Sequence, residues 1–227
     1  MINNMEHKRV LVISAHPDDY ELGMGMRIRK YANENVQVVA VTATKGEYKD
    51  SPNGREDQEK KAAKILGVSN QINLKFPCAE LSNCSNELRV QLEIIIKEFK
   101  PHVIYTIYDD NSHIDHHILS VQSSIAARST PNLIYYKVVG GIGFMPNMFF
   151  CGDNDLLNAK ISSLKCFSKE IKKAGAIDIK RSQVFAKYEI SNYLHHSCLS
   201  FIKKYKNIEN SKHMLFESFH IERMVSI

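Results

Sequence analysis

The chain has 227 residues, of which 44% are hydrophobic and 24% are charged, enough for one well-buried core, and we expect a single domain over residues 1–227. Its net charge is +5, with the lysines spread along the chain, so we do not expect nucleic-acid binding. No apolar run approaches the roughly 20 residues of a membrane-spanning helix, and the N-terminal apolar run is too short for a signal peptide. The five cysteines form no C-x-x-C pair, which argues against a disulfide framework or a thiolate zinc site and favours a cytoplasmic protein with reduced, mostly buried thiols.

Strand and helix patterns alternate along the chain. Short apolar runs rich in β-branched residues predict buried strands, and helical spacing of apolar residues predicts the helices between them. The expected strands are residues 10–13, 36–43, 72–76, 102–108, 133–139 and 215–221, with a short strand after the 140–150 loop. The expected helices are residues 20–33, 59–66 with Gly67 as C-cap, 86–99, a segment ending near 128, and most of 153–173 and 178–205. This alternation predicts a Rossmann-like three-layer α/β sandwich with a mostly parallel sheet.

Two clusters of metal-capable side chains follow the first and the fourth expected strands. The first cluster contains His16, Asp18 and Asp19, and the second contains His113 and His116, three residues apart at a helix start. Ligands of open α/β sheets bind outside the carboxyl ends of the strands, so both clusters are expected to line one crevice. Two imidazoles and one carboxylate leave a coordination position open for water, as in catalytic zinc sites, and a second carboxylate beside them could serve as a general base.

Two other patterns are interpreted as structural. His195 and His196 lie in a helical region without a carboxylate at ligand spacing, so we assign them to the core or the surface. Gly23 and Gly25 suggest a dinucleotide fingerprint, but Ile28 occupies the place of the third glycine, and the acidic residues before them would repel a pyrophosphate. A nucleotide cofactor is therefore not expected.

Taken together, the motifs resemble those of the LmbE-like, or PIG-L-type, family of zinc-dependent N-acetylglucosaminyl deacetylases. AHPDD is followed by ELGMG, TKGE, R-x-x-x-E-x-x-x-A-x-x-LG and HIDHH, and then by AAR-x-x-PN-x-IYY, F-x-PN-x-F and FESF. The similarity covers nearly the whole chain. Two positions depart from it: Tyr20 stands where many members have Glu, and Met26 stands where a glycine is common and could narrow the pocket.

The resemblance implies a metal site and two catalytic groups. His16, Asp19 and His116 would bind Zn²⁺, and Fe²⁺ could occupy the same site. Asp18 would be the general base for the attacking water. His113 would stabilise the oxyanion or protonate the leaving amine.

The remaining implied roles concern orientation and substrate binding. Asp115 would orient one of the histidines, as carboxylates behind metal ligands commonly do. Arg55 would hold sugar hydroxyls, with Glu47 and Asp110 as neighbours. The loops around residues 46–56 and 140–150 would determine selectivity, and the glycine-rich 140–150 loop is either a mobile flap or a set of simple turns.

The implied activity is removal of the N-acetyl group from an N-acetylglucosamine-containing small molecule or glycoconjugate, with release of acetate. Three alternatives stay open. They are a same-family amidase that cleaves a non-acetyl amide of a sugar conjugate, a non-haem iron oxygenase, which the βα alternation disfavours, and a non-catalytic sugar- or nucleotide-binding module. The oligomeric state is also open, with a homo-oligomer as one option.

Overall fold

The computed structural model describes residues 8–47, 53–172 and 215–225, together with residues 177–180, 182, 183 and 186. Its strands are β1 (Arg9–Ser14), β2 (Gln37–Thr44), β3 (Asn70–Phe76), β4 (Val103–Ile107), β5 (Leu133–Tyr136), β6 (Met148–Gly152) and β7 (Leu215–Arg223). Its helices are α1 (Asp19–Asn33), α2 (Glu56–Leu66), α3 (Ser85–Phe99), α4 (Ile114–Ala126), α5 (Asn154–Leu164) and α6 (Ser168–Lys172).

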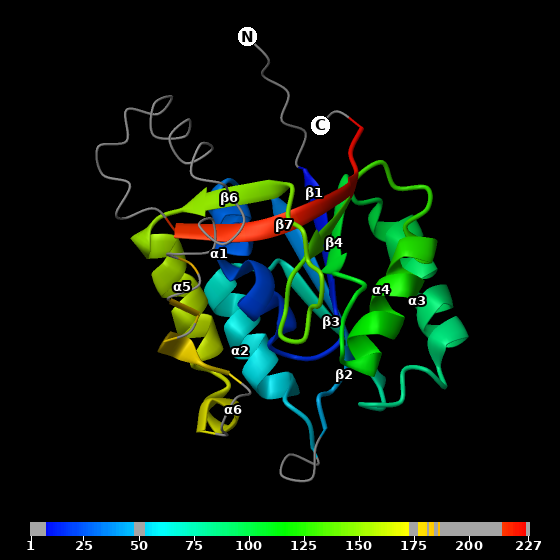
Figure 1. Cartoon of the computed structure of the whole chain (residues 1–227), viewed down its shortest axis with the longest axis horizontal. Helices are drawn as coiled ribbons and strands as arrows, with labels where there is room; N and C mark the ends of the chain where they lie inside the picture. The colour runs from blue at the N-terminus through cyan, green and yellow to red at the C-terminus, as the bar shows by residue number, and fades with distance from the viewer. Residues whose placement is uncertain are drawn as a thin grey trace.

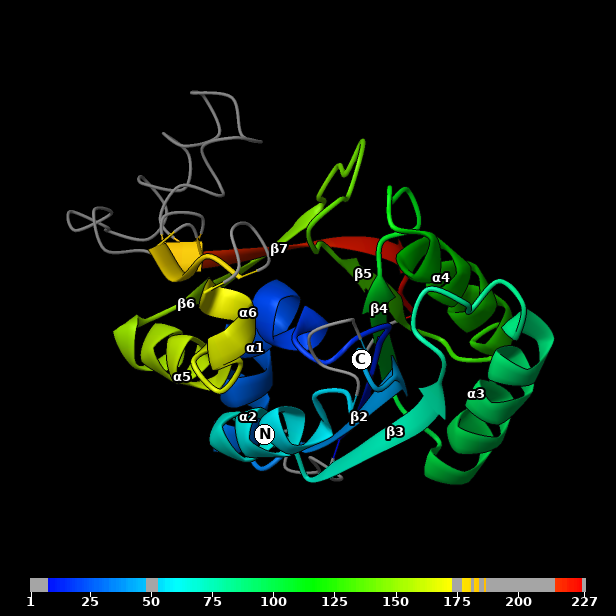
Figure 2. The ribbon, with the colours of Figure 1, turned by 90° about the horizontal axis from the view of Figure 1, so that it is seen from below.

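The strands form one sheet in the order β3-β2-β1-β4-β5-β7-β6. β1 to β5 pair in parallel, whereas β7 pairs antiparallel with both β5 and β6. Figure 1 shows α3 and α4 against one face of the sheet and α1, α2 and α5 against the other, and Figure 2 shows the same layers from below. The expected three-layer α/β fold with a mostly parallel sheet is confirmed.

The central strand β1 explains why the layers assemble in this way. Val10, Leu11, Val12 and Ile13 are each at most 1% exposed, as expected for a parallel strand covered by helices on both faces. The strand order reverses beside β1, since the chain runs outward through β2 and β3 and then returns to β4 on the other side. Ligands of doubly wound sheets bind at such a switch point.

Most expected elements are present, with shifted ends. α2 begins three residues earlier than expected, at Glu56, and Gly67 ends it with φ 81°, the left-handed conformation that favours glycine. The expected strand 133–139 ends at Tyr136. The expected helix 153–173 is divided into α5 and α6.

Some expectations fall on residues that the structure does not describe. Most of the expected helix 178–205, including His195 and His196, lies outside the described residues. Among the helices that are described, none has the length and apolar character needed to cross a membrane.

Candidate active site

The turn between β1 and α1 presents the first cluster. Asp18 has φ 109° and ψ −20°, a left-handed conformation that is uncommon for residues other than glycine and that is found preferentially at functional sites. Its carboxylate forms an ion pair with the Arg55 guanidinium. The Asp19 carboxylate is fixed by the turn itself, because its Oδ2 accepts hydrogen bonds from the backbone N–H groups of Ala15 (3.1 Å) and His16 (2.8 Å).

The first turn of α4 brings His116 to the same point. The Nδ1 atom of His16 lies 3.1 Å from Nε2 of His116 and 3.6 Å from Oδ2 of Asp19. Nε2 of His116 lies 3.3 Å from Oδ1 of Asp19. All three side chains are buried. Residues 100 positions apart in sequence therefore meet at the carboxyl end of the sheet, as the strand-end argument predicts.

These spacings fit a small divalent cation. Zinc binds imidazole nitrogen and carboxylate oxygen at about 2.0–2.2 Å, so donors around a tetrahedral ion lie about 3.3–3.5 Å apart. The three donors are 3.1–3.6 Å apart. His16 is also correctly oriented, because its Nε2 lies 3.0 Å from Oδ2 of Asp115. An ionised carboxylate only accepts hydrogen bonds, so in the neutral ring, the form that binds a metal, Nε2 carries the proton and Nδ1 faces His116 and Asp19 with its lone pair.

The electrostatics of the site favour a positive charge at the same place. Burial opposes the charge on His16, but its hydrogen bonds with the Asp115 carboxylate and with Cys78, together with the nearby Asp19 carboxylate, raise its pKa to about 10. Burial also opposes ionisation of Asp19, yet His116 and His16 hold its pKa below the usual range. Burial raises the pKa of Asp18 to about 6, with the Arg55 charge limiting the rise. A cation bound between His16, Asp19 and His116 would balance the negative charge of these carboxylates in the same way.

His113 lies beside the two other histidines. Its Nδ1 accepts a hydrogen bond from the backbone N–H of Asp115 (3.2 Å), which leaves Nε2 as the protonated nitrogen of the neutral ring. Its ring stacks on that of His116 with centroids 4.7 Å apart. Burial and the charges of His16 and His116 lower its pKa. One ring nitrogen of each of the three histidines lies within 4.8 Å of the others, so His113 can also be counted as a metal donor.

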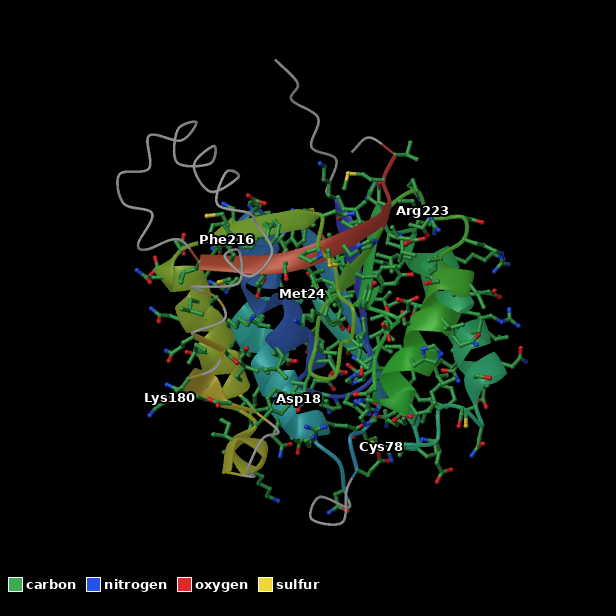
Figure 3. All side chains as sticks on the ribbon, in the orientation of Figure 1. Asp18, Met24, Cys78, Lys180, Phe216 and Arg223 are labelled. Carbon is green, nitrogen blue, oxygen red and sulfur yellow. The ribbon has the colours of Figure 1, made fainter. Side chains whose placement is uncertain are left out.

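Cys78 is a site residue that the sequence analysis missed. It is half-buried, and its Sγ lies within 4.8 Å of donor atoms of His16 and Asp115. Asp115 anchors the Cys78 loop by accepting hydrogen bonds from the backbone N–H groups of Ala79 (2.6 Å) and Leu81 (3.2 Å). Figure 3 shows Cys78 at the same end of the molecule as Asp18. The sequence feature that could have identified Cys78 is its position directly after β3, because the strand ends at the same edge of the sheet.

The three residues expected to bind sugar are placed differently from one another. Arg55 is 3% exposed and contacts Asp18, so it belongs to the site through the proposed base. Glu47 follows β2 and is half-buried, and Asp110 is exposed on the loop before His113. In the described part of the chain, no hydrogen bond or ion pair joins Glu47 or Asp110 to the metal-capable residues.

The two positions that depart from the family pattern lie in the interior. Tyr20 and Met26 are fully buried. Met26 packs in a cluster with Leu156 and Ile161 of α5. The expectation that Met26 narrows the pocket is therefore wrong, because its side chain points into the layer between α1 and α5.

Comparison with known proteins identifies relatives of the chain. The family model described as GlcNAc-PI de-N-acetylase, PIG-L, matches residues 11–126. An uncharacterized deacetylase of Escherichia coli, YaiS, is 31% identical over 167 residues, which cover 70% of this chain and 90% of the relative. The diacetylchitobiose deacetylase of Thermococcus kodakarensis is 25% identical over 187 residues, which cover 70% of this chain and 68% of the relative.

Solved structures share the fold. GalB, the 4-carboxy-2-hydroxymuconate hydratase of Pseudomonas putida, superimposes with a TM-score of 0.76 at 13% identity, covering 97% of this chain and 98% of the hydratase. A hydratase on the same architecture shows that the fold alone does not select the reaction. The reaction has to be argued from the side chains at the edge of the sheet.

Proposed function

Because the chain belongs to the PIG-L family of deacetylases, we propose that it uses a bound metal ion to hydrolyse the acetamide of an N-acetylglucosamine-containing small molecule or glycoconjugate. One observation carries this proposal. Two histidines and an aspartate, 3.1–3.6 Å apart, lie next to a second aspartate that is paired with an arginine. This combination supplies a cation site and an adjacent base.

His16, Asp19 and His116 would hold the ion. We propose Zn²⁺, and Fe²⁺ suits the same donor set. When bound, the ion would polarise the acetyl carbonyl and lower the pKa of water to near neutrality. Asp115 would keep His16 in the tautomer whose Nδ1 faces the ion, through the 3.0 Å contact with Nε2.

Asp18 would remove a proton from the attacking water. The Arg55 guanidinium, which is paired with the Asp18 carboxylate, favours its ionised form. The water oxygen then forms a bond to the carbonyl carbon.

His113 would act on the other side of the scissile bond. The backbone N–H of Asp115 donates to Nδ1 of His113, so the proton of the neutral ring is on Nε2. This Nε2–H can donate to the oxyanion or to the leaving nitrogen. The C–N bond breaks, the nitrogen takes a proton, and acetate and a free amino sugar are released.

We assign substrate selectivity to the loops around residues 46–56 and 140–150, and sugar-hydroxyl contacts to Arg55, Glu47 and Asp110. The second loop is anchored at its base, because Ile142 N–H donates to Asp110 O (2.7 Å) and Ser112 N–H donates to Gly140 O (2.9 Å). Its apolar side chains Val139, Ile142 and Met145 are 63%, 55% and 68% exposed. These side chains are suited to an apolar group attached to the sugar.

Two broader features complete the proposal. We propose that residues 1–227 form one catalytic domain, because all the described strands belong to a single sheet. Cys78, Cys84 and Cys166 are thiols outside any disulfide, which supports a reducing, cytoplasmic location.

Amide hydrolysis is tested with glucosamine derivatives that carry either an N-acetyl group or a longer N-acyl group, with the zinc-loaded protein. Stoichiometric acetate and amine from the acetylated sugar would support the deacetylase. Hydrolysis of the longer amide alone would favour the related amidase. Sugar binding without hydrolysis of either compound would favour a binding module.

A further inference from the structure

Helix α1, which follows Asp18 and begins at the proposed metal ligand Asp19, is interrupted by a kink. Within α1, Met24 has φ −147° and ψ 27°, values outside the helical range. The turn before the break begins at Asp19, and the part after it continues to Asn33. A new helical segment begins after the break, and its first N–H groups have no acceptor within the helix.

A carboxylate from the far end of the chain satisfies these groups. Glu217 of β7 accepts hydrogen bonds from the backbone N–H of Met26 at Oε1 (2.9 Å) and of Arg27 at Oε2 (2.8 Å). Oε1 also lies 2.7 Å from Nζ of Lys160 in α5. Glu217 is 3% exposed and Lys160 is 5% exposed. One buried carboxylate thus joins the C-terminal strand, α5 and the active-site helix.

The turn before the break is held against the sheet. A Cβ atom on Gly23 would lie 2.3 Å from Cδ2 of Tyr136, so only glycine allows this approach. The Tyr136 hydroxyl donates a hydrogen bond to the carbonyl of Ile13 in β1 (2.9 Å). The sheet therefore fixes the chain at Gly23, directly before the break, and Glu217 fixes Met26 and Arg27, directly after it.

We infer that Glu217 is a positioning residue for this site. By capping the second part of α1, it sets where the first turn of the helix stands relative to β1, and thereby fixes the carboxylates of Asp18 and Asp19. This inference rests on the proposed function, because it assumes that Asp19 is a metal ligand. Glu217 belongs to the FESF motif, which lies about 200 residues along the chain from the cluster of His16, Asp18 and Asp19.

The test uses Glu217→Gln, which keeps the size of the side chain but replaces one acceptor oxygen with a donor NH₂ group. That group must face a backbone N–H or the Lys160 ammonium, and both are donors. We expect Zn²⁺ affinity, measured by competition with a chromophoric chelator, to fall at least about tenfold, as for residues that orient metal ligands. The Met26 and Arg27 amides of the metal-free variant should exchange with solvent faster than in the wild type.

A second variant separates position from stability. Glu217→Gln leaves the buried Lys160 ammonium without its carboxylate, which destabilises a protein strongly. Glu217→Gln combined with Lys160→Met removes that charge. We expect the double variant to recover most of the lost thermal stability without recovering Zn²⁺ affinity. Lys160→Met alone, which keeps the cap, should bind Zn²⁺ like the wild type.

The matched control is Asp153→Ala. Asp153 caps α5 through a hydrogen bond from the backbone N–H of Leu156 to its Oδ1 (2.9 Å), so this change also removes a helix cap. It should lower the unfolding midpoint and leave Zn²⁺ affinity unchanged.

Two results would overturn the inference. One is a folded Glu217→Gln protein, single or double, with Zn²⁺ affinity within twofold of the wild type. The other is an equal loss of affinity in Asp153→Ala. A wild-type protein that binds Zn²⁺ but releases no acetate would instead refute the proposed function, while the affinities would still decide the role of Glu217.

Discussion

Asp18→Asn separates the proposed base from the metal ligands. The ligand atoms of His16, Asp19 and His116 are 3.1–3.6 Å apart without any contribution from Asp18, so the variant should bind Zn²⁺ within a few-fold of the wild type. Asparagine tolerates the left-handed backbone at this position. Loss of a general base lowers turnover by about 100- to 10,000-fold, which is about 2.7–5.5 kcal/mol of activation free energy.

The same substitution has a defined effect on stability. The Arg55 side chain is 4% exposed and is paired with Asp18. An asparagine oxygen still accepts a hydrogen bond from the guanidinium but carries no charge. Because burial raises the pKa of Asp18 to about 6 even with Arg55 beside it, the folded state favours a neutral side chain here, and we expect the free energy of unfolding near pH 7 to be no lower than that of the wild type.

The assays are acetate release under saturating substrate, Zn²⁺ competition and urea denaturation. Asp19→Asn is the matched control, since it makes the same chemical change at the next residue and should weaken Zn²⁺ binding as well as turnover. Turnover above about one tenth of the wild-type value in zinc-loaded Asp18→Asn would refute the assignment of Asp18 as the base, given the expected range.

Three further changes test other parts of the account. Burial raises the pKa of Glu59 from 4.5 to about 7. The free energy of unfolding of the wild type, relative to that of Glu59→Gln, should therefore fall by about 3 kcal/mol between pH 4 and pH 8, since one pKa unit corresponds to about 1.36 kcal/mol. Gly23→Ala should destabilise the fold by about 1–3 kcal/mol or more, because the new Cβ would lie 2.3 Å from the Tyr136 ring, whereas Gly141→Ala meets only a 3.4 Å contact and should be tolerated. Iodoacetamide should inactivate the wild type but not Cys78→Ser, because Cys78 is half-buried beside His16.

Each of these predictions has a clear contrary result. The folded state holds the Glu59 proton more tightly than the unfolded state, so this stabilisation is fully present below pH 4.5 and is lost as the pH rises through about 7. If the difference in unfolding free energy between the wild type and Glu59→Gln does not change with pH, the raised pKa of the Glu59 carboxyl group is contradicted. Equal stability of the two glycine variants would contradict the packing of α1 on Tyr136. Inactivation of Cys78→Ser at the wild-type rate would place the reactive thiol elsewhere.

The convergence of the two clusters was predictable because it depends on topology alone. His16 follows β1 and His116 follows the end of β4, and these strands are neighbours where the strand order reverses. The carboxyl ends of parallel neighbours lie at one edge of the sheet. The pattern of apolar runs therefore carried enough information to bring together residues 100 positions apart.

Contacts that depend on backbone conformation or distant packing were not predictable in this way. The left-handed Asp18 and its pairing with Arg55 arise from a tight turn and from a loop after another strand. Cys78 enters the site because Asp115 anchors its loop. The Glu217 cap requires β7 to return antiparallel beside β5, and no local periodicity in the sequence specifies that pairing.

We propose that this edge of the sheet holds a metal ion that the protein uses to release acetate. The most direct measurement is acetate release from N-acetylglucosamine derivatives by metal-free protein and by the same protein reconstituted with Zn²⁺, with His116→Ala beside the wild type. We predict acetate only from the reconstituted wild type, with His116→Ala weak in Zn²⁺ binding and inactive. Acetate release that is independent of zinc, or undiminished in His116→Ala, would contradict the account.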